Sequence, residues 1–99
     1  MVRNKDDILD ALAREAQALR GLGVRRLALF GSAVRGTLHA DSDLDFLVEL
    51  QPKTFDTYMN VKEFLESRFQ HPIDLVLRSA LHPELREEIL RQAVDARLD

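Results

Sequence analysis

The 99-residue sequence contains no cysteine and no tryptophan, and it has only three prolines and four glycines. The absence of cysteine excludes disulfide frameworks and zinc sites built on thiolates. No apolar run approaches the roughly 20 residues that a transmembrane helix needs. The first residues turn directly amphipathic, without the apolar stretch of a secretory signal. We therefore expect a cytoplasmic protein with no membrane partner.

An excess of positive charge is also missing. The chain carries 14 Lys and Arg against 17 Asp and Glu, a net charge of −3. Proteins that bind nucleic acid are usually basic overall or carry a basic stripe, whereas the longest basic cluster here is Arg25 and Arg26. The hydrophobic share of 45% is that of an ordinary globular protein. We expect one small domain over residues 1–99, without a nucleic-acid partner.

Three helices are predicted from apolar periodicity and capping residues. Asn4 is placed to cap a first helix, in which apolar residues recur at helical spacing until Gly21 ends it. Thr54 begins a second helix of the same kind. Pro83 lies where a first-turn proline belongs and opens the last helix.

Three short strands are predicted between these helices. Residues 27–30 form a short apolar run, residues 43–50 alternate between acids and hydrophobes, and residues 73–77 are apolar around one acid. The resulting order is α-β-β-α-β-α. This order predicts an α+β fold (α/β-type), a short mixed β-sheet with helices packed on it.

The acidic residues of two strands form the first candidate site. Side chains alternate along a strand, so Asp43 and Asp45 point the same way, with Cα atoms about 6.6 Å apart. Asp74 is the single acid of the third strand, and a buried carboxylate is costly unless it is paired or holds a metal. If the two strands are neighbours, three carboxylates converge and call for a divalent cation.

Calcium is an alternative ligand for these acids. Asp41, Asp43 and Asp45 match the opening of an EF-hand loop, which then needs a glycine and, at its twelfth position, a glutamate. Phe46 and Pro52 occupy those positions. The EF-hand hypothesis therefore fails.

A phosphate-binding loop is predicted directly after the first strand. Gly31 lets the backbone approach a ligand closely. The next backbone amides and the Ser32 hydroxyl can donate to an anion. Arg35, three residues further on, can complement phosphate charge.

The spacing of these residues resembles that of a known superfamily. Gly31 and Ser32, followed after ten residues by Asp43 and Asp45, resemble the signature of the DNA polymerase β-like nucleotidyltransferases. The Arg35-Gly36 pair and the later Ile73-Asp74-Leu75-Val76 segment narrow the resemblance to the minimal nucleotidyltransferase (MNT) family, along almost the whole chain.

The resemblance implies a nucleotidyltransferase fold and a role for each motif residue. Gly31 and Ser32 would hold the triphosphate of ATP, the substrate. Asp43, Asp45 and Asp74 would bind two Mg²⁺ ions, and Asp74 would also be the candidate base near the attacking hydroxyl.

Members of the family are often encoded beside a HEPN-domain ribonuclease toxin and act as its antitoxin. The resemblance thus implies AMP transfer from ATP to a tyrosine hydroxyl of that toxin, and it leaves homo- or hetero-oligomer formation open. A small-molecule acceptor such as an aminoglycoside is an alternative, although enzymes of that kind carry a further domain for which 99 residues leave no room. An antitoxin that acts by binding alone is a second alternative.

The remaining polar and apolar features are interpreted structurally. Tyr58 lies on an apolar helical stripe, so we interpret it as a core residue and not as an acceptor. Leu81 and Leu85 are expected to pack on the chain's own sheet, or to form a partner surface with Leu98. The histidines are interpreted as solvated loop residues: His39, His71 and His82.

Overall fold

The structure is a computed structural model that describes residues 4–39 and 41–98. Its elements, in chain order, are α1 (Lys5–Arg14), α2 (Ala16–Gly21), β1 (Val24–Phe30), α3 (Ser32–Arg35), β2 (Leu44–Leu50), α4 (Phe55–Phe69), β3 (Ile73–Leu77), the 3₁₀ turn η1 (Arg78–Ala80), α5 (Pro83–Gln92) and β4 (Val94–Asp95). Over these two ranges, no helix combines the length and the hydropathy that a membrane crossing requires.

The N-terminal helical segment is divided into two helices. The Asn4 side chain accepts a hydrogen bond from the backbone N–H of Asp7 at 3.0 Å, which confirms the predicted cap. The single helix expected up to Gly21 is wrong, because the chain bends at Glu15 between α1 and α2. The Glu15 carboxylate lies 3.6 Å from the Arg68 guanidinium of α4. Both halves keep apolar residues buried, so the bend fits the segment to the core.

The sheet is mixed and has the strand order β3-β2-β1-β4. β1 pairs with β2 and with β4 in antiparallel fashion, and β2 pairs with β3 in parallel. The mixed sheet expected from the sequence is confirmed, with three differences. β1 begins at Val24 and not at residue 27. β2 begins at Leu44, so Asp43 lies one residue before the strand, and the two-residue strand β4 was not predicted.

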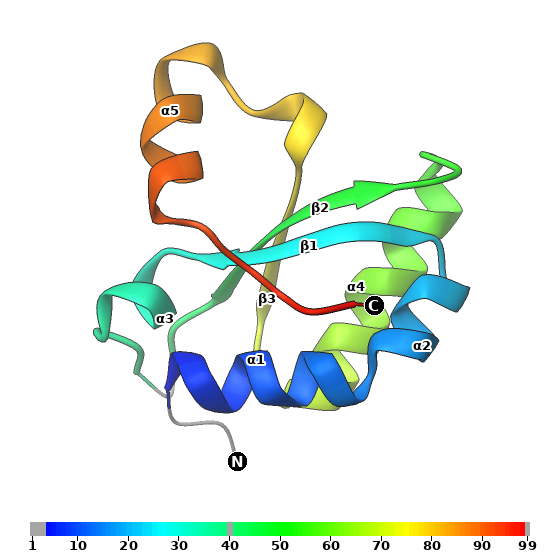
Figure 1. Ribbon diagram of the computed structural model, residues 1–99, viewed down its shortest axis with the longest axis horizontal. Coiled ribbons are helices and arrows are strands. Elements are labelled where there is room, and N and C mark those ends of the chain that lie inside the picture. The colour runs from blue at the N-terminus through cyan, green and yellow to red at the C-terminus, as the bar shows by residue number, and fades with distance from the viewer. Residues whose placement is uncertain (1–3, 40, 99) are drawn as a thin grey trace.

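One face of the sheet is covered by α1, α2 and α4, which Figure 1 shows grouped together. Phe46 of β2 is fully buried there and stacks on Phe69 of α4, with ring centroids 6.0 Å apart. The side chains of Asp45, Leu47 and Glu49 alternate with this apolar set and lie on the opposite face. The candidate site is therefore on the face that these helices leave uncovered.

Helix α5 stands apart from α1, α2 and α4 (Figure 1). It contains no buried residue, and its Leu85 side chain is 57% exposed. The expected packing of Leu85 on the sheet is therefore wrong, whereas Leu81 is half-buried. The helix forms because His82 caps its first turn and Pro83 occupies the first position, and these local features do not depend on packing.

Candidate functional site

The sheet register brings two of the three predicted acids together. Asp45 of β2 is the direct partner of Asp74 of β3, and on its other side it faces Phe30 at the end of β1. Asp45 is half-buried, whereas Asp74 and Asp43 are exposed. The sequence analysis required the strands predicted at 43–50 and 73–77 to be neighbours for their acids to meet. The pairing of β2 with β3 confirms that they are neighbours.

The environment of Asp45 disfavours its ionised form. Burial, followed by the negative charges of Asp74 and Asp43 and a hydrogen bond with Asp74, raises the pKa of Asp45 from 3.8 to about 6. The positive charge of Arg35 acts in the opposite direction. The site thus concentrates negative charge around a half-buried carboxylate, with one cationic side chain near enough to affect it.

Gly31 brings the backbone against this carboxylate. Its φ of 77° and ψ of −146° are accessible to glycine and not to other residues. A Cβ atom at this position would lie 2.9 Å from Cγ of Asp45 and closer still to its Oδ2. The close approach expected for Gly31 exists in the structure, and the group approached is the Asp45 side chain.

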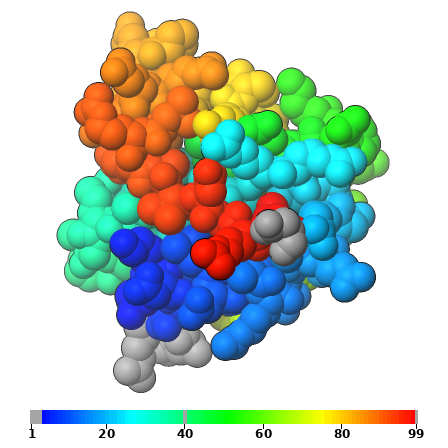
Figure 2. All heavy atoms as spheres, viewed as in Figure 1, coloured from blue at the N-terminus to red at the C-terminus, as the bar shows by residue number. Residues whose placement is uncertain are grey.

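The residues after Gly31 form the short helix α3. Ser32 is its first residue and is half-buried, and Arg35 is its last residue and is exposed. The Arg35 Nη1 donates to the Oε1 of Gln92, 3.4 Å away at the end of α5. Figure 2 shows the surface of α5, in orange, bordering the teal surface of α3. Sequence reasoning missed Gln92, because no motif or periodicity connects positions 35 and 92.

The carboxylate oxygens of the three predicted acids are ligands of the kind that a hard divalent cation binds. Among residues 4–39 and 41–98, no three or more His, Cys, Asp and Glu side chains are arranged so that together they could hold a metal ion. The donor set of Asp43, Asp45 and Asp74 is nevertheless entirely oxygen, which Mg²⁺ prefers. A bound cation would also relieve the repulsion that raises the pKa of Asp45. The residues therefore fit Mg²⁺, and the predicted ligand set stays a prediction.

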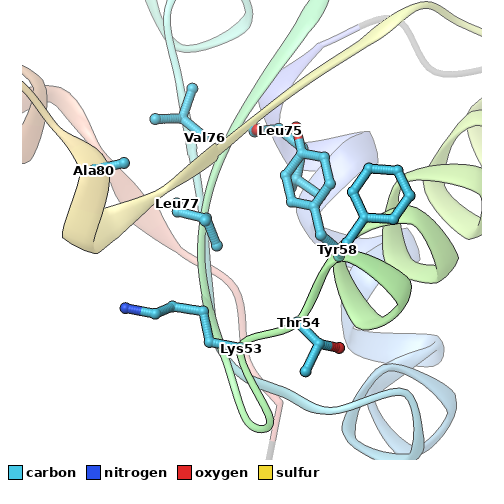
Figure 3. A pocket seen from close by; sticks show the side chains of 8 residues that line it. Lys53, Thr54, Tyr58, Leu75, Val76, Leu77 and Ala80 are labelled. Atoms are coloured by element: carbon cyan, nitrogen blue, oxygen red, sulfur yellow. Dashed lines mark hydrogen bonds between the residues drawn. The ribbon is translucent and has the colours of Figure 1, made fainter.

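A cavity of about 590 Å³ lies elsewhere, between β3 and the start of α4 (Figure 3). Lys53, Tyr58 and Leu77 are among its lining residues, and no predicted site residue is. The Tyr58 hydroxyl donates to the backbone oxygen of Leu75 at 2.6 Å, and its ring packs against the core. The interpretation of Tyr58 as a packing residue is confirmed.

Two of the histidines are exposed as expected. His39 lies in a loop, and His82 accepts a hydrogen bond from the Glu84 backbone N–H at 3.3 Å. His71 is half-buried, and its Nδ1 lies 3.1 Å from the Ser42 backbone oxygen, so the solvated interpretation is wrong for this residue.

Comparison with known proteins agrees with this geometry. The family model of the nucleotidyltransferase domain matches residues 8–96. The protein adenylyltransferase MntA of Thermococcus cleftensis is 33% identical over 91 residues, which cover 90% of this chain and 92% of that protein. A solved structure described as a candidate minimal nucleotidyltransferase has a TM-score of 0.71 at 34% identity, covering 87% of this chain and 93% of that chain.

A further solved structure supports the fold alone. A crystal structure described as a toxin–antitoxin with AMP-PNP has a TM-score of 0.70, over 88% of this chain and 70% of that chain. Its sequence identity is 22%. Together these likenesses confirm the fold that the sequence motifs predicted.

Proposed function

Because this chain belongs to the nucleotidyltransferase domain family, we propose that it transfers AMP from Mg·ATP to a hydroxyl group of a partner protein. The observation that carries the proposal is the register pairing of Asp45 with Asp74 directly beside the glycine turn at Gly31. This arrangement places an acid cluster next to the loop that resembles the family's triphosphate-binding motif. Since ATP is an intracellular nucleotide, the proposed reaction belongs in the cytoplasm.

In the proposed site, Gly31, Ser32 and Arg35 bind the triphosphate. Asp43, Asp45 and Asp74 would hold Mg²⁺, which supplies positive charge opposite the triphosphate and the departing pyrophosphate. The negative charges of these carboxylates have fixed positions, because Asp45 and Asp74 are held by paired strands.

The transfer itself is an in-line displacement at the α-phosphorus of ATP. The acceptor oxygen forms the new P–O bond, the bond to the β-phosphate oxygen breaks, and pyrophosphate leaves. Asp74 is exposed and can take the proton of the attacking hydroxyl. The half-buried Asp45 is less accessible to an acceptor, which favours Asp74 for this role.

For the acceptor, we infer a tyrosine hydroxyl of a HEPN-domain toxin, with this chain acting as the antitoxin. The curated relative is named a protein adenylyltransferase, and a fold neighbour is described as a toxin–antitoxin. An antitoxin that acts by occlusion needs no acid cluster. Burial and the neighbouring acids disfavour the ionised form of Asp45, so the presence of the acid cluster favours catalysis over binding alone.

The test combines the purified chain, Mg·ATP and the cognate toxin, with intact-mass spectrometry of the toxin. We expect the toxin to gain the mass of AMP, and we expect Asp45→Asn and Asp74→Asn to abolish the gain while toxin binding persists. Glu63→Gln, an exposed acid of α4, is the matched control and should transfer AMP as the wild type does. An unmodified toxin after long incubation with the wild type would refute the proposal, and modification of an added aminoglycoside would support the small-molecule alternative.

A further inference from the structure

The side-chain amide of Gln92 bridges two groups of opposite character at the edge of the candidate site. Its Oε1 accepts from Arg35 Nη1 at 3.4 Å, and its Nε2 donates to Glu88 Oε1 at 3.3 Å. A guanidinium can only donate and a carboxylate can only accept, so these two partners orient the amide oxygen towards Arg35. Glu88 also accepts a hydrogen bond from Arg91 Nη1 at 3.0 Å. The carboxylate that binds the Gln92 amide is therefore itself held by another residue of α5.

The neutral partner distinguishes Arg35 from the arginines that form described ion pairs. Those arginines bind carboxylates: Arg26 with Asp95 and Glu49, Arg68 with Glu15, Arg78 with Glu49, and Arg91 with Glu87 and Glu88. A carboxylate partner would compete with a triphosphate for the guanidinium, whereas an amide orients the group and leaves its charge available. Arg35 also lies near enough to the acids for its charge to act on Asp45.

We propose that Gln92 is a positioning residue that holds the Arg35 guanidinium beside the ATP triphosphate without neutralising it. The inference rests on the proposed function, because it assumes that Mg·ATP binds at the loop that carries Arg35. It extends the site to a helix that has no buried residue and that no motif assigns to the reaction.

The direct test measures the dissociation constant of Mg·ATP by calorimetry for the wild type and for Gln92→Met. Methionine keeps the length of the side chain and removes the amide. We expect the dissociation constant to rise roughly three- to ten-fold, as for the loss of a hydrogen bond that orients a charged group. Gln92→Glu should raise it further, because the new carboxylate would compete for Arg35. The control is Gln17→Met, an exposed helical glutamine of α2, which should bind as the wild type does.

A double-mutant cycle separates positioning from a general structural effect. If Gln92 acts through Arg35, Gln92→Met should have no further effect on Mg·ATP binding in an Arg35→Ala background. A merely structural role would give the same loss in both backgrounds. Thermal melts of each variant without nucleotide should match those of their parents, since Gln92 is only half-buried at the end of α5.

The outcomes distinguish this inference from the function on which it rests. If the wild type does not bind Mg·ATP, both are overturned. If the wild type binds Mg·ATP and Gln92→Met binds equally well, or if the two substitutions are additive, the positioning role alone is overturned.

Discussion

Asp45 of β2 and Asp74 of β3 are direct register partners across two parallel strands. Their carboxylates are therefore brought together by backbone pairing and not by a loop that could adjust. The pairing also keeps Asp74 beside the half-buried Asp45, so burial first and then the charge of Asp74 raise the pKa of Asp45. Because the strand pairing fixes their positions, the two carboxylates repel each other until a bound cation or a proton offsets the charge.

The first prediction concerns the pH dependence of stability in the presence of EDTA. The folded protein keeps the Asp45 proton up to about pH 6, whereas the unfolded chain releases it near 3.8. Between these values the folded state binds more protons, so the Asp45 contribution to the free energy of unfolding falls as the pH rises. Asp45→Asn should remove this decrease and melt higher than the wild type at pH 7.

Thermal melts across that pH range check this prediction, with Glu63→Gln as a control that should keep the wild-type slope. If Asp45→Asn melted several degrees lower than the wild type at pH 7, Asp45 would be a structural acid that needs its charge.

A second prediction follows from the backbone of Gly31. Gly31→Ala should lose both stability and AMP transfer, because its backbone conformation costs a non-glycine residue about 1–3 kcal/mol and the new methyl group would displace Asp45. Gly36→Ala is the matched control. Gly36 also has a positive φ, of 79°, but a Cβ atom there meets no atom within 4 Å.

Gly36→Ala should therefore lose about 1–2 kcal/mol of stability from the left-handed conformation alone, and it should keep its transfer activity. Chemical denaturation and a transfer assay give both quantities. Equal activities of the two alanine variants would contradict the close packing of Gly31 against Asp45.

Tyr58 provides a third prediction. Tyr58→Phe removes the hydroxyl that donates to the Leu75 backbone oxygen, so we expect a loss of about 0.5–1.5 kcal/mol in the free energy of unfolding. AMP transfer should be unchanged. Thr37→Val, which removes a long and exposed hydrogen bond of 3.5 Å to Ser32, should cost less. Loss of transfer at full stability would instead place Tyr58 in the functional site.

The fourth prediction compares two leucines on different helices. Leu65 of α4 is fully buried, whereas Leu85 of α5 is 57% exposed. Leu65→Ala should cost about 2–5 kcal/mol through lost burial and a cavity. Leu85→Ala should stay within about 0.5 kcal/mol of the wild type, as surface substitutions usually do. Urea denaturation of the two variants checks this, and a large loss for Leu85→Ala would show that α5 is packed in solution.

Capping residues and apolar runs in the sequence predicted the helices and strands that depend on such local features. The Thr54 side chain accepts from the Thr57 backbone N–H at 3.1 Å, as its position before an apolar stripe suggested. The segment at 73–77 is a strand as its apolar run indicated. The bend at Glu15 had no such signal, because no glycine or proline marks it. β4 was missed because two residues carry no periodicity, and the strand exists only through pairing with β1.

The sequence predicted which residues belong to the candidate site, but it did not predict which of them contact one another. Spacing suggested Gly31, Asp45 and Asp74, and the register then placed Asp45 beside Asp74. The contact between Gly31 and Asp45 depends on the crossing of two chain segments, which a one-dimensional pattern does not contain. The Gln92 contact with Arg35 spans 57 positions and needs the folded chain.

The short strand β4 has a consequence for how copies of this protein meet. Val94 and Asp95 pair with Leu29 and Ala28, and Asp95 also binds the Arg26 guanidinium at 3.0 Å. They thereby occupy the outer hydrogen-bonding groups of an apolar strand, which would otherwise offer a template for another chain. Removing residues 94–99 would expose this edge and would also take Leu98 out of the core, so we expect it to promote aggregation through edge-to-edge strand pairing, even though the deletion leaves every predicted site residue in place.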